Sequence, residues 1–167
     1  RRVKPFVPPV TLQTIYKTLV QPYFDYCSPL WDTCGKVLQD KLQKFQNRAA
    51  RIITGASYDV RSADVLDTLG WETLDARRLR NKSILMYKIL NDHTAPNLKD
   101  LFRKKYETHQ NVLNLRNSET DLMLAKPKTE FLKRTFGYSS AILWNNLPQE
   151  LKLAESVSSF KRQIQKI

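Results

Sequence analysis

The sequence predicts a mostly α-helical protein, with a helical bundle followed by a smaller, less regular C-terminal module. The chain has 167 residues, enough for a hydrophobic core that needs no disulfide or metal support. It contains 4 glycines, about 2% against an average of about 7%, which disfavours folds built on tight turns between strands. Apolar residues recur three and four positions apart over much of the N-terminal part, the spacing of amphipathic helices.

The first helix is expected after the prolines of the opening segment, which favour an extended lead-in through Val10. From Thr11 onward the apolar positions follow helical spacing. They are Leu12, Ile15, Tyr16, Leu19, Val20, Tyr23, Tyr26, Cys27 and Leu30. Pro22 would remove a backbone hydrogen bond from the helix interior, so we expect a kink or a second short helix with Pro22 in its first turn.

A second helix is expected over Leu38–Thr54. Its apolar residues step by four, three, four and three positions, so they would form one buried seam. These residues are Leu38, Leu42, Phe45, Ala49 and Ile52. Gly55 follows as the left-handed stop that commonly ends a helix.

Further along the chain, Ser62 can cap a short helix that stops before Gly70, and Trp71 would fill the core behind it. A long helix is expected over Thr73–Asn91, and a short one near residues 98–102.

The rest of the sequence is less regular. Residues 103–116 are polar, basic and aperiodic, so we expect no regular element there. Residues 121–125 have the composition of a strand, and residues 141–146 that of a helix. Ser156 is expected to cap a last helix.

The expected organisation is a helical bundle over residues 1–102, a connector over 103–117 and a small C-terminal module over 118–167.

The whole chain carries 28 basic and 16 acidic residues, a net charge of +12, which favours polyanions as partners. Most of the excess lies near the two ends. Residues 1–55 have nine basic and three acidic residues, and residues 132–167 have six basic and two acidic residues.

Four basic residues share one face of the helix expected over Leu38–Thr54. They are Lys41, Lys44, Arg48 and Arg51. At about 1.5 Å per residue this row spans about 15 Å, enough to follow several phosphates along a nucleic-acid backbone. The alternative interpretation is a solvated helix surface whose charges serve solubility.

Other charged and aromatic residues are expected to be structural. Residues 56–92 contain equal numbers of basic and acidic residues, so Arg77 or Arg78 is expected to form ion pairs within the fold. Aromatic side chains near the first helices could stack on bases, but at helical spacing they more often belong to a core. They are Tyr16, Tyr23, Tyr26 and Trp31.

The sequence offers no catalytic or metal-binding constellation. Asp25 and Asp32 are seven residues apart, about 10 Å along a helix, which is too far for a two-metal site. His93 and His109 lack a second ligand at a suitable spacing, so no metal and no cofactor are expected.

The two cysteines form no CxxC pair, which favours a reducing compartment. No apolar run approaches the roughly 20 residues of a membrane span, so no membrane partner is expected.

Four stretches of the chain carry a resemblance to a known family. Residues 12–27 read LQTIYKTLVQPYFDYC and residues 42–55 read LQKFQNRAARIITG. Residues 136–141 read FGYSSA and residues 143–148 read LWNNLP. Together these stretches resemble the region after the palm, and the C-terminal tail, of non-LTR (LINE-type) retrotransposon reverse transcriptases.

This resemblance implies a thumb-like bundle and post-thumb segment of an RNA-directed DNA polymerase that copies element RNA at a nicked chromosomal target. The implied partners are template–primer nucleic acid, held through its backbone as a duplex or RNA–DNA hybrid, and the remainder of the parent polymerase. The implied location is nuclear, with cytoplasmic assembly on element RNA. The paired aspartates of the family's palm are missing, since no Asp-Asp dipeptide occurs here, so the chain by itself is not expected to be an enzyme. Because thumb helices of polymerases hold the template–primer backbone, the resemblance selects the same row, Lys41, Lys44, Arg48 and Arg51.

Two other classes of function remain open from the sequence. A helical protein–protein interaction adaptor, such as a reused fragment of an element, would bind partner helices and have no nucleic-acid role. An autonomous nuclease would need clustered carboxylates, which the sequence does not provide.

Overall fold

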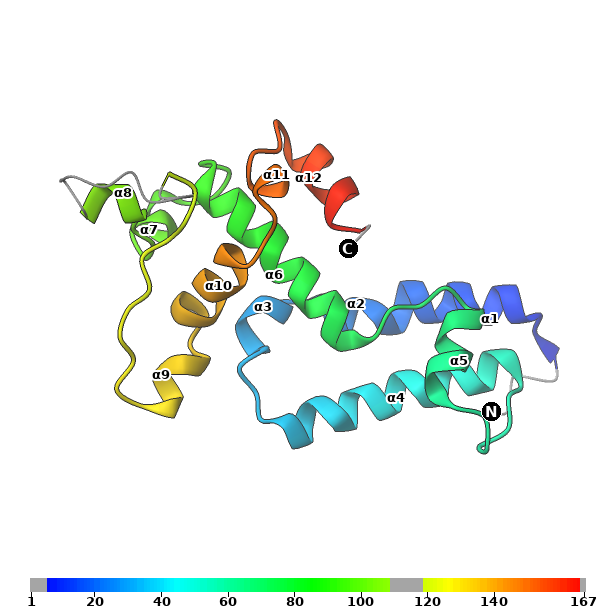
Figure 1. Cartoon of the computed structure of the whole chain (residues 1–167). Helices are drawn as coiled ribbons and strands as arrows, with labels where there is room; N and C mark the ends of the chain where they lie inside the picture. The colour runs from blue at the N-terminus through cyan, green and yellow to red at the C-terminus, as the bar shows by residue number, and fades with distance from the viewer. Residues whose placement is uncertain (1–5, 109–118, 166–167) are drawn as a thin grey trace. The chain divides into compact units, whose positions relative to one another are not determined.

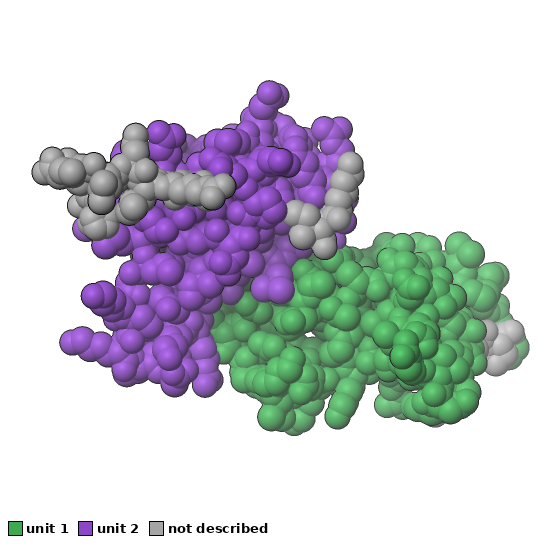
Figure 2. Space-filling view, in the orientation of Figure 1, with its two compact units in different colours: residues 1–78 green, residues 79–167 purple. Residues whose placement is uncertain are grey.

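The computed structural model describes residues 6–108 and 119–165 (Figure 1). These residues are mostly helical, which confirms the predicted fold class. The chain divides into two compact units, Arg1–Arg78 (unit 1) and Leu79–Ile167 (unit 2), coloured separately in Figure 2. The division falls inside one helix. The connector expected over 103–117 stays a prediction, because residues 109–117 lie outside the described part of the chain.

Unit 1 consists of short N-terminal helices, one long helix and the beginning of another. Its elements are α1 (Pro9–Ile15), a π-helical turn (Tyr16–Val20), α2 (Gln21–Asp25), α3 (Ser28–Trp31), α4 (Lys36–Thr54), α5 (Ser62–Thr68) and the start of α6 (Leu74–Leu90). Helix α4 packs against α1 and α5.

The interruption predicted at Pro22 is present. Pro22 lies in the first turn of α2, as one of the two expected arrangements requires. Directly before it, the backbone N–H of Gln21 donates to the carbonyl of Tyr16, five residues back, which is a π-helical bond. Because a proline nitrogen carries no hydrogen, the chain passes through this wider turn and starts a new helix at Gln21.

Helix α4 ends as predicted but buries a different face. Gly55 adopts a φ of 79°, and its N–H donates to the carbonyl of Arg51 at 2.9 Å. The buried residues of α4 are Gln46, Ala50 and Ile53. The seam expected from Leu38 to Ile52 is therefore wrong, because its residues are exposed or only partly buried. They are Leu38, Leu42, Phe45, Ala49 and Ile52.

The short helix predicted after Ser62 is present as α5, but its N-cap is Arg61 rather than Ser62. The helix begins at Ser62 itself, one residue earlier than expected, and the Ser62 hydroxyl accepts a hydrogen bond from Arg51. Gly70 follows with a φ of 62°, a left-handed conformation suited to glycine. Trp71 then stacks on Tyr16, with ring centroids 4.2 Å apart, and packs against the small core of Ala50, Val65 and Leu66.

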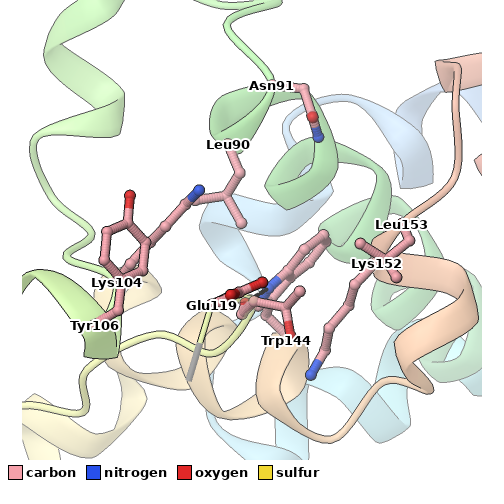
Figure 3. Close-up of a pocket in the computed structure, with 9 residues that line it drawn as sticks. Leu90, Asn91, Lys104, Tyr106, Glu119, Trp144, Lys152 and Leu153 are labelled. Carbon is pink, nitrogen blue, oxygen red and sulfur yellow. Dashed lines mark hydrogen bonds between the residues drawn. The ribbon is translucent and has the colours of Figure 1, made fainter. Parts of the chain in front are cut away.

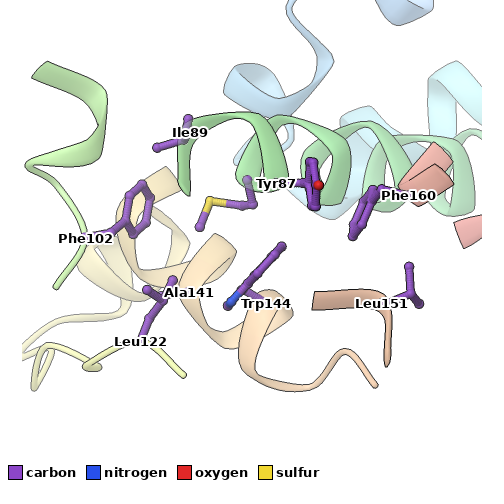
Figure 4. Packing of buried hydrophobic residues seen from close by; sticks show 9 residues of the cluster. Tyr87, Ile89, Phe102, Leu122, Ala141, Trp144, Leu151 and Phe160 are labelled. Carbon is purple, nitrogen blue, oxygen red and sulfur yellow. The ribbon is translucent and has the colours of Figure 1, made fainter. Parts of the chain in front are cut away.

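Unit 2 is built around the C-terminal part of α6. Its other helices are α7 (Pro96–Lys99), α8 (Lys105–Thr108), α9 (Glu130–Arg134), α10 (Phe136–Asn145), α11 (Gln149–Lys152) and α12 (Val157–Ile164). Figure 4 shows the core that they enclose. Its buried side chains are Met86, Tyr87, Ile89, Phe102, Leu122, Ala141, Trp144, Leu151 and Phe160. Tyr87 stacks on Phe160 at 4.5 Å and donates its hydroxyl to the carbonyl of Ala154 at 2.5 Å.

The predicted cap of the last helix is confirmed, because the Ser156 hydroxyl accepts the backbone N–H of Ser159. The strand predicted over 121–125 is wrong: the described residues contain only an isolated antiparallel bridge between Lys104 and Leu122. The cause is a side chain, since Asn145 accepts from the N–H of Leu122 at 2.8 Å and donates to its carbonyl at 2.9 Å. Both backbone groups of Leu122 are thus satisfied without a neighbouring strand.

Candidate nucleic-acid interface

Helix α4 is oriented by two glutamines on its inner side. Gln46 donates its side-chain amide to the carbonyl of Glu72 at 3.1 Å. Gln43 accepts the backbone N–H of Leu74, the first residue of α6, at 2.8 Å. Ala50 is fully buried among residues of α5. These contacts fix the rotation of α4 and leave the opposite side of the helix facing outward.

The outward side of α4 carries four long side chains around a hollow of about 320 Å³. They are Lys41, Lys44, Phe45 and Arg48. All four are exposed, and Phe45 retains 64% of its accessible surface. Positions three, four and seven apart lie on one face of a helix, so the local spacing alone brings them together.

The charge of this hollow is positive. Lys41, Lys44 and Arg48 form no ion pair within the ranges 6–108 and 119–165. The sole acidic residue of the α4 sequence, Asp40, pairs with Lys36 at 3.5 Å. Three cations therefore face solvent within about 10 Å of helix length, with no carboxylate lining the hollow. Such a cluster creates a local positive potential that attracts phosphates.

Arg51, the fourth residue of the predicted row, has a different environment. Its guanidinium donates to the carbonyl of Val60 at 2.6 Å, to the carbonyl of Ser57 at 3.3 Å and to the hydroxyl of Ser62 at 3.1 Å. It also lies over the ring of Tyr58, 5.7 Å from the centroid. Arg51 thus holds the segment between α4 and α5, and it does not line the hollow with Lys41, Lys44 and Arg48.

The pairing predicted for Arg77 or Arg78 is confirmed for both residues. Arg77 bonds both oxygens of Asp25, at 2.5 and 2.6 Å, and these bonds raise the pKa of its guanidinium. Arg78 is buried and bonds Asp32 at 3.1 Å and Asp75 at 3.0 Å. The arginine partners of Asp25 and Asp32 lie 52 and 46 residues further along the chain, beyond what local spacing can indicate.

The expectation that most N-terminal aromatic residues lie in the core is wrong. Tyr16 is buried, and burial raises the pKa of its hydroxyl to about 12. Trp31 is partly buried, and its indole lies against Arg78. Tyr23 and Tyr26, however, retain 82% and 78% of their accessible surface. Unit 1 therefore presents aromatic side chains to solvent that sequence spacing assigned to packing.

In unit 2 the side chains of Trp144 and Lys152 have structural roles. Trp144 donates its indole N–H to the carbonyl of Thr120 at 2.9 Å. Lys152, whose side chain is 2% exposed, donates to Asp121 at 2.9 Å and to the carbonyl of Asn145 at 3.0 Å. Burial opposes ionisation of Asp121, but bonds from Lys105 and Lys152 outweigh it and lower the pKa of this carboxyl.

A hollow of about 620 Å³ lies beside this network (Figure 3). It is lined by Leu90, Asn91, Lys104, Tyr106, Glu119, Thr120, Trp144, Lys152 and Leu153. The ammonium of Lys152 and the indole N–H of Trp144 are already bonded within the fold. These two groups are therefore committed to stabilising unit 2.

The histidine and cysteine side chains considered in the sequence analysis differ in exposure. In the part of the chain that the structure describes, no group of His, Cys, Asp or Glu side chains is arranged to hold a metal ion. His93 is exposed, and His109 lies outside the described residues. Cys27 is exposed rather than part of an apolar stripe, and Cys34 is partly exposed.

Comparison of the chain with protein-family models, with curated proteins and with solved structures finds no match. Among the described helices, none combines the length and apolar content needed to span a membrane.

Proposed function

We propose that the chain is a non-catalytic, nucleic-acid-binding segment of a non-LTR retrotransposon reverse transcriptase. In this proposal, α4 holds template–primer duplex through its phosphate backbone. The observation that carries the proposal is the trio of exposed cations Lys41, Lys44 and Arg48 on the outward face of α4. The four sequence stretches that resemble the post-palm and tail regions of that family supply the polymerase context.

The mechanism is positional. Backbone contacts fix the register and orientation of a duplex without reading its sequence, so a primer end stays aligned with an active site that the parent polymerase provides. The fold supports this role because the glutamine contacts of α4 hold the cations on a defined face. In such a parent protein the segment would assemble with element RNA in the cytoplasm and act in the nucleus.

The salt dependence of duplex binding tests this proposal. Three phosphate contacts give a slope of about −2.7 for log affinity against log salt, or a loss of about 40-fold between 50 and 200 mM. We expect fluorescence anisotropy with a labelled RNA–DNA hybrid to show a slope of this order, similar for unrelated sequences. Absence of binding at low salt, or affinity unchanged by salt, would contradict the proposal.

A helical protein–protein adaptor is the second candidate, and the exposed apolar residues of unit 1 favour it. They include Leu19, Tyr23, Tyr26 and Leu30. Large exposed apolar side chains on neighbouring turns are characteristic of interaction surfaces. An adaptor of this kind has no nucleic-acid role, so the titration with the RNA–DNA hybrid would show no salt-dependent binding and separates the two candidates.

A further inference from the structure

Phe45 differs from the other exposed aromatic residues of unit 1 because it lines a hollow together with three cations of α4, which are Lys41, Lys44 and Arg48. The exposed phenyl ring of Phe45 leaves apolar surface in water, which does not stabilise the free protein. A ligand that combines an apolar planar face with negative charge would cover this phenyl ring and contact the neighbouring cations.

Unpaired nucleotides have this combination of properties. Within a duplex the faces of the bases are covered by their stacked neighbours, and a protein side chain meets only base edges and phosphates. A base beyond the end of the duplex exposes its face, and proteins that hold single strands stack aromatic side chains on such bases beside a positively charged groove.

The placement of the cations agrees with this ligand. Lys41 and Arg48 are seven residues apart, about 10 Å along the helix, and Phe45 lies between them in the sequence and lines the same hollow. Cations before and after Phe45 along the helix can therefore contact phosphates of the strand whose base lies over the phenyl ring.

We propose that Phe45 stacks on an unpaired base where a duplex gives way to single strand, so that this site prefers a duplex with a single-stranded overhang to a blunt one. The inference rests on the proposed function and adds Phe45 as a residue that determines the form of nucleic acid bound. The backbone contacts and the stacking contact are chemically separate, so each has its own signature.

The test compares two ligands of equal charge: a duplex with a short overhang of normal nucleotides, and the same duplex with an abasic overhang that keeps the phosphates but lacks the bases. Wild-type protein is expected to bind the base-bearing overhang roughly 5- to 150-fold more tightly, the contribution of stacking one base. This preference should persist as salt rises, because it does not depend on charge.

Three variants assign the preference to one ring. Phe45→Leu should abolish the preference, so that the two overhangs bind with equal affinity, and Phe45→Tyr should retain it because the aromatic face is kept. Phe131→Leu is the matched control, since Phe131 is an exposed phenylalanine on α9 of unit 2. It should bind like wild type.

Equal affinity of wild-type protein for the two overhangs, or a preference that survives Phe45→Leu, would overturn the stacking inference. If binding to the abasic ligand still weakened with salt and with Lys44→Gln, the proposed function would stand without it. Absence of salt-dependent binding to either ligand would overturn the proposed function as well.

Discussion

The two units differ in the size of their buried apolar cores. Unit 2 encloses a continuous core in which Phe160 and Leu122 are fully buried. Unit 1 has a small core around Ala50 and leaves Tyr23 and Phe45 largely exposed. Burial of large apolar side chains is the main source of folding free energy, so the larger core of unit 2 contributes more to folding than the core of unit 1. The exposed residues of unit 1 stabilise little in the free chain, which suits a surface that contacts a ligand or a partner.

The largest expected effect on stability comes from replacing a buried phenylalanine, and the same substitution at an exposed phenylalanine is the comparison. Phe160→Ala should lower the free energy of unfolding of unit 2 by about 3–5 kcal/mol, because it leaves a cavity beside Tyr87 and Trp144. Phe45→Ala should change stability by no more than about 0.5 kcal/mol, since the ring is exposed. Urea unfolding followed by circular dichroism measures both. Comparable losses in the two variants would mean that Phe45 is buried in solution.

A smaller effect is expected at the buried ion pair of unit 2. Asp121→Asn should destabilise the unit by about 2–3 kcal/mol at pH 7, because Lys152 would keep its buried charge without a full counter-charge. The structure also predicts how this loss depends on pH. Since the pKa of Asp121 is held below its usual value of 3.8, its stabilising contribution is present above that value and disappears as the pH falls through the lowered pKa.

Thermal melts of wild type and Asp121→Asn over a range of pH check this prediction. The two melting curves should differ at neutral pH and converge below about pH 4. A difference that stayed constant across the acidic range would show that the carboxyl does not titrate as its contacts require.

The smallest expected effect on stability is the difference between two arginine substitutions in α4. Arg51→Ala should cost about 1–2 kcal/mol, because its three hydrogen bonds hold the segment that leads to α5. Arg48→Ala should lie within about 0.5 kcal/mol of wild type, since Arg48 is exposed. The urea midpoints of the two variants measure this difference. A larger loss of stability for Arg48→Ala than for Arg51→Ala would contradict the structural role of Arg51 and the exposure of Arg48.

Local sequence signals predicted where helices are interrupted and where they end, but they did not predict the tertiary contacts that the helices make. Gly55 and Pro22 act through backbone geometry, which their own chemistry determines, and both predictions are confirmed. The buried face of α4 could not be predicted from apolar spacing. The glutamines at 43 and 46 bond to backbone groups near the start of α6, and those bonds turn Phe45 outward.

The candidate site shows the same limit. The spacing of Lys41, Lys44 and Arg48 predicted a shared face because helical geometry alone sets it. Arg51 has the same spacing but lies near a segment that offers it two carbonyls and a hydroxyl. That environment depends on how the chain returns to α5, which no local pattern encodes. The apolar character of Phe45 predicts a core position, and only its exposure in the fold shows that it lines the hollow.

The most direct test of the central claim compares two triple variants that remove the same charge. Lys41→Gln/Lys44→Gln/Arg48→Gln neutralises the exposed cations of α4, and Lys128→Gln/Lys161→Gln/Arg162→Gln neutralises two lysines and one arginine exposed on unit 2. We expect the α4 variant to lose most of its affinity for an RNA–DNA hybrid and to make the salt slope shallower by about 2.7, while the unit 2 variant keeps the slope of wild type. Equal losses in both variants, or unchanged binding in the α4 variant, would contradict the assignment of nucleic-acid contact to α4.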